Sequence, residues 1–334
     1  MDGAGYRPVA RFRRVSTVDP IARPAVAGEG CPVCGSRDFA APGSLQGPDR
    51  LEATPGWFSV LVCAGCGAGR TLPRVSDEEL GAYYTSDYHA HAVERGALFQ
   101  LAWRLGQWRR WRRVLGRWPF GGLTSGKPGR ALDIGCGRGD FGAALIARGW
   151  TVVGIDPSPS AVAAARARGL DARVGFLDTV EFGEETFDAV SMLHALEHVS
   201  DPVAVLRRAR ELLRPGAVLV LELPNFDCWS RRRMGSHWFH LDLPRHRTHF
   251  TPEALRRALD AADFVAVDVR DAADRAALVG TLQYRWFGGV VLRSGWGSAA
   301  WQALAVVLGP VTALLDRVGG GRDFLRASAR RPGA

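Results

Sequence analysis

The stretch LDIGCGRGD, at residues 132–140, decides the fold that we expect for this chain. Its three glycines follow a short apolar segment and precede a helical pattern, so a ligand can lie against bare backbone at the turn. A second apolar segment ends at Asp156, where a carboxylate can accept hydrogen bonds from both hydroxyls of a ribose. Gly135 and Asp156 are separated by the length of one β-α-β unit.

Two other nucleotide sites are disfavoured by this stretch. A dinucleotide site would carry a third glycine at position 140, where this chain has Asp140. A phosphate-binding loop would carry Gly-Lys followed by Ser or Thr, which is absent from the sequence. We therefore expect neither a nicotinamide cofactor nor a nucleoside triphosphate.

From residue 129 onward, apolar runs alternate with helical patterns, which is typical of a parallel α/β sheet. Asp201-Pro202 and Thr251-Pro252 each place a capping residue before a proline at the first helical position. The predicted strands lie at 131–134, 151–155, 172–175, 187–193, 217–223, 264–269 and 323–330.

The composition is that of a globular protein. Of the residues, 47% are hydrophobic and 23% charged, which excludes a disordered, collagenous or disulfide-dense chain. The 334 residues predict about two folded units. The net charge is +9, but Lys127 is the only lysine among 43 basic residues, so we discount the charge as evidence for an acidic partner. No apolar stretch precedes Arg11, and we expect a cytoplasmic protein without a secretory signal.

Two Cys-x-x-Cys-Gly motifs begin at Cys31 and Cys63. Thiolates at this spacing grip two sides of a tetrahedral Zn²⁺, and the glycine after each second cysteine permits a tight turn. Four protein ligands leave no position for water or substrate, so we expect a structural zinc, with free thiols or a redox pair as the alternative. The predicted ligands are Cys31, Cys34, Cys63 and Cys66.

These patterns divide the chain into four parts. They are a disordered arm at 1–28, a zinc-ribbon leader at 29–90, an amphipathic helix at 91–120 and the α/β domain at 129–334. The apolar repeat of the amphipathic helix covers 94–118, and we expect it to pack over the active site or against another subunit, with RNA or a membrane surface as alternatives.

A helical insertion is expected over about 277–317. Its apolar part, 299–315, falls short of a clean membrane span. A lid, a homodimer contact and peripheral membrane attachment stay open for this segment.

These residues resemble class I S-adenosylmethionine-dependent methyltransferases over about 129–270. The motifs that carry the resemblance occur in the family's order: the glycine loop, Asp156, Phe187-Asp188, LEHVSDP at 196–202 and LRPG at 213–216. Residues 31–88 are similar to the zinc-ribbon leader of a bacterial small-molecule and sugar methyltransferase subgroup. The matching residues are Pro73, Tyr83, Tyr84 and Tyr88, and later Trp238, Asp242, Pro244, His246 and Phe250.

The resemblance implies a Rossmann-like, seven-stranded α/β sheet that binds S-adenosylmethionine. It places the methionine portion at the glycine loop, the ribose at Asp156 and the adenine at 175–177. Many relatives carry Asp at the position of Phe176, and Asp178 is a candidate replacement. The predicted cofactor-binding residues are Asp133, Gly135, Cys136, Gly137, Gly139, Asp156, Pro157, Phe176, Leu177 and His194.

Methyl transfer is an in-line displacement that needs a base only when the acceptor must lose a proton. Histidines gather where we expect the carboxyl end of the sheet, at positions 194, 198, 237, 240, 246 and 249. We name His198, His194 and His246 as candidate catalytic residues. Related quinone-pathway enzymes carry an acidic residue at the position of His194, so a catalytic divalent ion is an alternative. The stretch 194–198 also fits the zinc-peptidase pattern H-x-x-E-H, which we interpret as coincidence because it follows a buried strand.

The sequence therefore predicts methylation of a small molecule, such as a sugar, a sugar nucleotide or a secondary metabolite, with oxygen as the expected acceptor. The expected cofactors are S-adenosylmethionine and a structural zinc ion. Two alternatives are an RNA methyltransferase that uses the ribbon and the basic helix to hold nucleic acid, and a scaffold that binds the cofactor without turnover.

Overall fold

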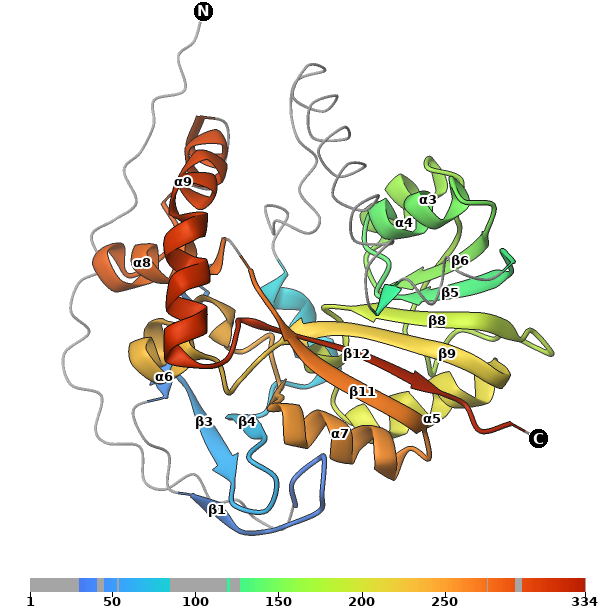
Figure 1. The fold of residues 1–334 in the computed structure, drawn as a ribbon, viewed down its shortest axis with the longest axis horizontal. Helices are drawn as coiled ribbons and strands as arrows, with labels where there is room; N and C mark the ends of the chain where they lie inside the picture. The colour runs from blue at the N-terminus through green and yellow to red at the C-terminus, as the bar shows by residue number, and fades with distance from the viewer. Residues whose placement is uncertain are drawn as a thin grey trace, which may run out of the picture.

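The computed structural model describes residues 30–40, 45–52, 54–84, 119–120, 127–274, 276–291 and 296–333. The predicted arm at 1–28 and the apolar repeat at 94–118 lie outside these residues, as does Tyr88. Two sheets and the helices around them form the described part of the molecule (Figure 1).

A seven-stranded sheet with the order β11-β12-β9-β8-β5-β6-β7 forms the domain. Its strands are β5 (Arg130–Ile134), β6 (Thr151–Asp156), β7 (Asp171–Val174), β8 (Phe187–Leu193), β9 (Leu213–Pro224), β11 (Val265–Ala272) and β12 (Phe324–Arg330). β12 runs antiparallel to both β9 and β11, whereas the pairs from β9 to β7 are parallel. The expected Rossmann-like, seven-stranded fold is confirmed. β9 is longer than predicted because it starts directly after a helix, at Leu213.

Helices cover both faces of this sheet (Figure 1). α3 (Asp140–Ile146) and α4 (Pro159–Arg166) lie on one face, and α5 (Pro202–Leu212) and α7 (Pro252–Ala261) lie on the other. The predicted caps form: Asp201 accepts a hydrogen bond from Ala204 N–H at 2.9 Å, and Thr251 accepts one from Ala254 N–H at 3.1 Å. Each cap satisfies a backbone donor that the first turn would otherwise leave unpaired.

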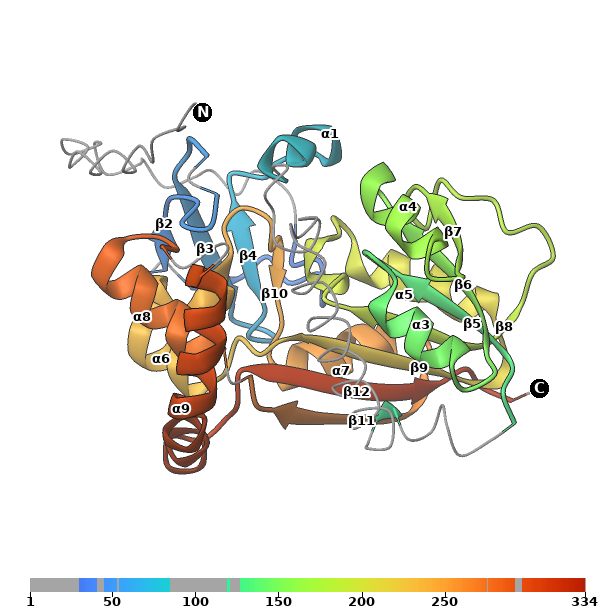
Figure 2. The ribbon, with the colours of Figure 1, turned by 90° about the horizontal axis from the view of Figure 1, so that it is seen from above.

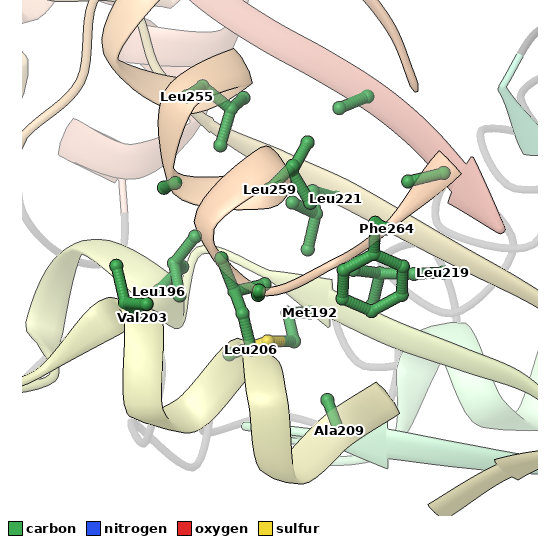
Figure 3. Packing of buried hydrophobic residues seen from close by; sticks show 14 of the residues in the cluster. Met192, Leu196, Val203, Leu206, Ala209, Leu219, Leu221, Leu255, Leu259 and Phe264 are labelled. Carbon is green, nitrogen blue, oxygen red and sulfur yellow. The ribbon is translucent and has the colours of Figure 1, made fainter. Parts of the chain in front are cut away.

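The larger core lies between the sheet and the helices α5 and α7 (Figure 3). Val203, Leu206 and Ala209 recur every three residues along α5 and turn one helical stripe toward the sheet. Leu219 and Leu221 of β9 meet them from the sheet side, both fully buried. A second core fills the opposite face around Phe141 and Leu145 of α3. Burial on both faces accounts for the near-continuous apolar strands seen in the sequence.

The leader forms a second, smaller sheet with the order β1-β3-β4-β10, to which β2 adds on β3. Its elements are β1 (Phe39–Ala40), β2 (Gln46–Gly47), β3 (Phe58–Cys63), β4 (Gly69–Leu72), α1 (Asp77–Leu80) and η1 (Gly81–Tyr83). The strand β10 (Thr248–His249) comes from the α/β domain and pairs antiparallel with β4. The leader sheet is therefore completed by a strand that lies far away in the sequence.

Apart from α7, the helices between β9 and β12 gather at the end of the molecule away from the C-terminus (Figure 2). They are α6 (Trp229–Met234), η4 (Gly235–His237), η5 (Phe239–Leu241), α8 (Ala277–Phe287) and α9 (Trp296–Gly319). α8 and α9 form the helical insertion predicted at about 277–317. Among the described residues, no helix is long and apolar enough to cross a membrane.

Candidate active site

The glycine loop follows β5 and touches the end of β6. The N–H groups of Gly135 and Cys136 both donate to the Ile155 carbonyl at 2.9 Å, and Gly137 N–H donates to Asp156 Oδ2 at 2.9 Å. Gly135, Gly137 and Gly139 have φ of 71°, 52° and 79°, a backbone region that favours glycine. The sequence places these glycines where the turn needs them.

The other predicted cofactor residues surround this loop with different exposures. Asp133 is 2% exposed and accepts a hydrogen bond from Ser191 Oγ at 2.7 Å, and burial raises its pKa to about 7. Cys136 is buried, which raises the pKa of its thiol. Leu177 is also buried, whereas Pro157 and Phe176 are exposed, the latter by 47%. The exposed side chains are those available to a ligand in this arrangement.

The segment after β8 lies directly beside the glycine loop. A Cβ atom on Gly135 would stand 2.8 Å from the Cβ of Ala195, so a larger residue at 135 would collide with this segment. His194 precedes Ala195 with φ of 56°, a strained conformation for a residue with a side chain. The turn continues as η3 (Leu196–His198), which carries the predicted site residue His198.

Two of the three candidate histidines meet in the fold. The rings of His198 and His246 have centroids 4.7 Å apart, although their segments are separated by α5 and β9. Glu197, which is 2% exposed, lies between these rings and His194. His194 Nδ1 is 3.5 Å from Glu197 Oε1, and His246 Nε2 is 4.0 Å from the same oxygen.

Hydrogen bonds set the tautomers of the paired histidines. His198 Nδ1 lies 3.1 Å from the Arg245 carbonyl, and His246 Nδ1 lies 2.9 Å from the His240 carbonyl. Because a carbonyl only accepts, each Nδ1 carries the hydrogen and each Nε2 carries a lone pair. Tyr84 of the leader places its hydroxyl 2.9 Å from His198 Nδ1 as well.

Electrostatics separates the three histidines. Burial lowers the pKa of His198, and burial together with the neighbouring His198 lowers the pKa of His246 to about 4. Burial also opposes the charge on His194, but Glu197 and Glu222 outweigh it and raise the pKa to about 10. Near neutral pH, His198 and His246 are therefore neutral, and His194 is a cation.

Glu197 holds the negative charge of the cluster. Burial favours its protonated form, but the three neighbouring histidines outweigh burial and lower its pKa to about 2. Within the described part of the chain, neither carboxylate oxygen receives a hydrogen bond. One ligand atom from each of Glu197, His198 and His246 lies within 4.8 Å of the others, an arrangement suited to sharing a proton or to holding a divalent cation.

The leader reaches this cluster through a buried ion pair. Arg245, fully buried, donates from Nη1 and Nη2 to the two carboxylate oxygens of Asp49 at 2.9 and 2.6 Å. The same guanidinium binds Asp242 Oδ1 at 2.6 Å, and Asp242 Oδ2 lies 3.6 Å from His246 Nε2. A chain of charges thus joins the leader to a candidate catalytic histidine.

The remaining histidines have other surroundings. His249 is 3% exposed and shares a 2.9 Å hydrogen bond with the Thr71 hydroxyl, while His240 Nε2 is 3.0 Å from Asp274 Oδ2. Burial lowers the pKa of His249 to about 3, so that this ring is neutral. We interpret His249 as a structural residue that holds the leader sheet on the domain.

A cavity of about 200 Å³ opens on the other side of residues 244–248. Its walls include Arg70, Arg74 and Arg247, with Asp201 from the start of α5. His246 is not among the lining residues, because its ring turns toward Glu197 instead. The segment 244–248 therefore lines an arginine-rich cavity through Pro244, Arg247 and Thr248, and joins the histidine cluster through His246.

The four predicted zinc ligands come together in the leader. Their sulfur atoms all lie within 4.8 Å of one another, with Cys31 to Cys66 and Cys34 to Cys63 each at 3.6 Å. The glycines after the two motifs have φ of 72° and 74°, as the tight turns require. A set of four thiols at this spacing fits the size and ligand preference of Zn²⁺.

Comparison with known proteins agrees with this geometry. A family model described as a methyltransferase domain matches residues 102–269, half of the sequence. The chain belongs to this methyltransferase family. The ubiquinone biosynthesis O-methyltransferase of Xanthomonas campestris pv. campestris is 33% identical over 153 residues, 42% of this chain and 64% of the relative. The protein of the same name from Cereibacter sphaeroides is 32% identical over 163 residues, 45% of this chain and 63% of the relative.

The chain thus spans less than two thirds of the length of those curated relatives. A solved structure, the phosphoethanolamine N-methyltransferase 2 of Haemonchus contortus with S-adenosylhomocysteine, has a TM-score of 0.51 at 17% identity. The match covers 79% of this chain and 62% of that one, and it shows the shared fold. None of these comparisons favours the RNA-methylating or scaffold alternatives.

Several residues of this site were not singled out from the sequence. Glu222 faces His194 at 3.4 Å from β9, and Asp49 and Arg245 form the buried pair described above. A lone acidic residue in a strand or loop carries no local signal of its partner. Glu197 did carry one, because it lies inside the LEHVSDP motif between two named histidines.

Proposed function

We propose that this protein transfers a methyl group from S-adenosylmethionine to an oxygen atom of a small molecule. Its membership of the methyltransferase family, the names of its relatives and the glycine loop with its positive φ angles support this proposal. The cofactor would supply an electrophilic methyl group. Gly135, Gly137 and Gly139 would hold its methionine portion and Asp156 its ribose, with Phe176 and Leu177 beside the adenine.

The observation that carries the mechanism is the neutral His198 beside the ionised Glu197. Its Nδ1–H is fixed by the Arg245 carbonyl, so its Nε2 lone pair is free to accept a proton from an acceptor hydroxyl. His198 would thereby free the acceptor oxygen to take the methyl group, with S-adenosylhomocysteine as the leaving group. Glu197 stabilises the imidazolium that forms, as a carboxylate beside a histidine base does.

The other two histidines take different roles in this proposal. His194 has a pKa near 10 and is a poor base at neutral pH, but as a cation it can attract the developing alkoxide of the acceptor. His246 is neutral and lies next to His198, so it serves as a second proton carrier. Only His198 therefore needs to act as the first base.

Methyl-labelled S-adenosylmethionine, incubated with the protein and a host lysate split into RNA and small-molecule fractions, tests this function. We expect label in the small-molecule fraction. With the product identified, His198→Ala should lower kcat by about 10²- to 10⁴-fold and leave cofactor affinity unchanged by calorimetry. His237→Ala, a histidine outside the cluster, is the matched control.

Two outcomes would contradict the proposal. Label that enters RNA and disappears on ribonuclease treatment would mean that nucleic acid is the substrate. Cofactor binding without turnover on any fraction would leave only the scaffold alternative.

We also propose a structural zinc ion bound by the four cysteines of the leader. The converging thiols and the glycine turns support it, and their ligation needs the reduced state that a cytoplasmic location provides. The ribbon packs on the domain through α7, where Thr251 Oγ1 donates to the Cys66 carbonyl at 3.3 Å and Arg257 donates to the Gly65 carbonyl at 2.9 Å. Zinc would thereby hold one wall of the active-site region in place.

A further inference from the structure

In helix α9, polar side chains face the protein and aliphatic side chains face outward. Thr312 and Asp316 turn toward the protein interior and are 4% and 5% exposed. Aliphatic side chains of the same helix point outward: Val306 is 69% exposed, Val307 70% and Val318 80%. A surface helix of a globular protein in water shows the opposite arrangement. The outward face of α9 is built for an apolar neighbour.

Further exposed apolar side chains lie at the end of α8. Trp286 is 69% exposed and Phe287 is 59% exposed, and α8 packs against α9 (Figure 1). We call this surface the α8–α9 patch. Its exposed members are Trp286, Phe287, Val291, Leu304, Val306, Val307, Val311, Leu314 and Val318. So many exposed apolar side chains on one helix and the end of the helix packed against it indicate a binding surface.

Charge at the borders of the patch indicates what covers it. Residues 296–315 of α9 carry no charged side chain, whereas Arg285 adjoins Trp286 and Arg317 adjoins Val318, both exposed. An apolar face with aromatic residues at one end and arginines at its borders is the pattern of a helix that lies in the headgroup region of a bilayer. The positive charge of these two border arginines complements the phosphates of an anionic lipid surface.

We propose that the α8–α9 patch docks this protein on the surface of an anionic lipid bilayer. The aliphatic face of α9 and the ring of Trp286 enter the interface, and Arg285 and Arg317 contact the lipid phosphates. Among the described residues no helix could cross a membrane, so the attachment is peripheral. This docking does not depend on the methyl-transfer proposal, because it requires neither the cofactor nor the histidines.

Docking would occur next to the candidate active site. Thr281 of α8 accepts a hydrogen bond from Phe239 N–H at 3.1 Å, and the Phe239 ring lies 5.4 Å from that of Trp301 on α9. The next residue, His240, offers its carbonyl to His246 Nδ1. The patch therefore supports, from its inner side, the segment that leads to the histidine cluster.

Vesicle flotation of the full chain tests the proposal. The vesicles are phosphatidylcholine alone, or phosphatidylcholine with 30% phosphatidylglycerol, at low and high salt. We expect the protein to float with the anionic vesicles, and to do so at least tenfold less with neutral vesicles or at high salt. Val307→Asp/Leu314→Asp should lower the bound fraction at least tenfold. Val265→Asp, at a site that is 47% exposed on β11, should leave it unchanged.

Light scattering and circular dichroism accompany the flotation. The patch variant removes only exposed side chains, so its thermal unfolding should match that of the wild type. Two results would overturn the proposal: the absence of binding to anionic vesicles, or a wild-type dimer that the patch variant converts to a monomer. The second result would assign the patch to another copy of the chain.

Discussion

The leader and the α/β domain are held together by different means. The domain buries two large clusters of aliphatic side chains against a seven-stranded sheet, and its strands are long enough to make that burial cooperative. The leader sheet has strands of two to six residues and fills its small core with side chains borrowed from the domain, among them Phe226 and Trp238. A segment of that size needs an additional stabilising link such as a bound metal ion, and its four cysteines provide a place to bind one.

The leader and the domain also differ in how they accommodate a buried carboxyl group. Asp49 of the leader is fully buried and receives two hydrogen bonds from Arg245, two from backbone N–H groups and one from Thr54. Asp133 of the domain is 2% exposed and receives one hydrogen bond from Ser191. The leader satisfies its buried charge with a partner from the domain, and the domain instead buries a carboxyl that gives up its charge near neutral pH.

Removal of the metal should destabilise the leader and leave the domain folded, which is the largest expected difference between the two regions. Structural zinc in small modules contributes on the order of 10 kcal/mol to folding, more than the leader's small core can replace. We expect Cys63→Ser, or treatment with a chelator, to release one zinc ion per chain and to expose residues 30–84 to protease while the domain stays resistant. Cys228→Ser, at a buried cysteine of the domain, should keep the metal. A Cys63→Ser protein with full metal content would contradict the proposed site.

Loss of the ion pair between Asp49 of the leader and Arg245 of the domain should have the next largest effect on stability. Asp49→Ala removes one of the two carboxylates that bind the buried Arg245, and loss of a partner costs about 3–5 kcal/mol in comparable buried pairs. Chemical denaturation should report this loss, and kcat should fall because Arg245 also positions Asp242 and the carbonyl that binds His198. Asp38→Ala removes an exposed leader carboxylate and should be neutral. Equal stability of the two variants would show that the ion pair does not anchor the leader.

The pH dependence of stability tests the buried carboxyl group of Asp133. The pKa of Asp133 is raised from 3.8 to about 7 by burial, so the folded state holds a proton that the unfolded state releases. This residue therefore takes stability away as the pH rises from 4 to 7, by up to about 4 kcal/mol. In Asp133→Asn that loss should be absent. The stability of the variant relative to the wild type should therefore increase as the pH rises across this range. Denaturant midpoints at pH 5 and pH 8 measure the difference, and an equal gap at both pH values would contradict it.

Much of the site follows from local sequence. Glycines at 135, 137 and 139, the caps at Asp201 and Thr251, and the two cysteine motifs each act within a few residues of their own position. Backbone conformation and helix capping depend on neighbouring residues, so they can be recognised in the sequence. The seven-stranded sheet follows because apolar runs and helical patterns alternate regularly.

Contacts between distant segments belong to the tertiary structure. Nothing near Tyr84 or Asp49 in the sequence indicates a partner more than 100 residues away, yet Tyr84 meets His198 and Asp49 meets Arg245. The charge state of His194 was likewise hidden, because it depends on Glu197 of η3 and Glu222 of β9, which meet only in the fold.

By itself, the sequence determined the methyltransferase fold, the glycine loop and the cysteine motifs, because local backbone geometry and periodic burial suffice to specify them. Only the tertiary structure decided that β10 completes the leader sheet, that His198 is neutral while His194 is charged, and that α9 turns its aliphatic face outward. Burial and electrostatic potential are sums over neighbours in space, and those neighbours are set by the fold and not by sequence distance.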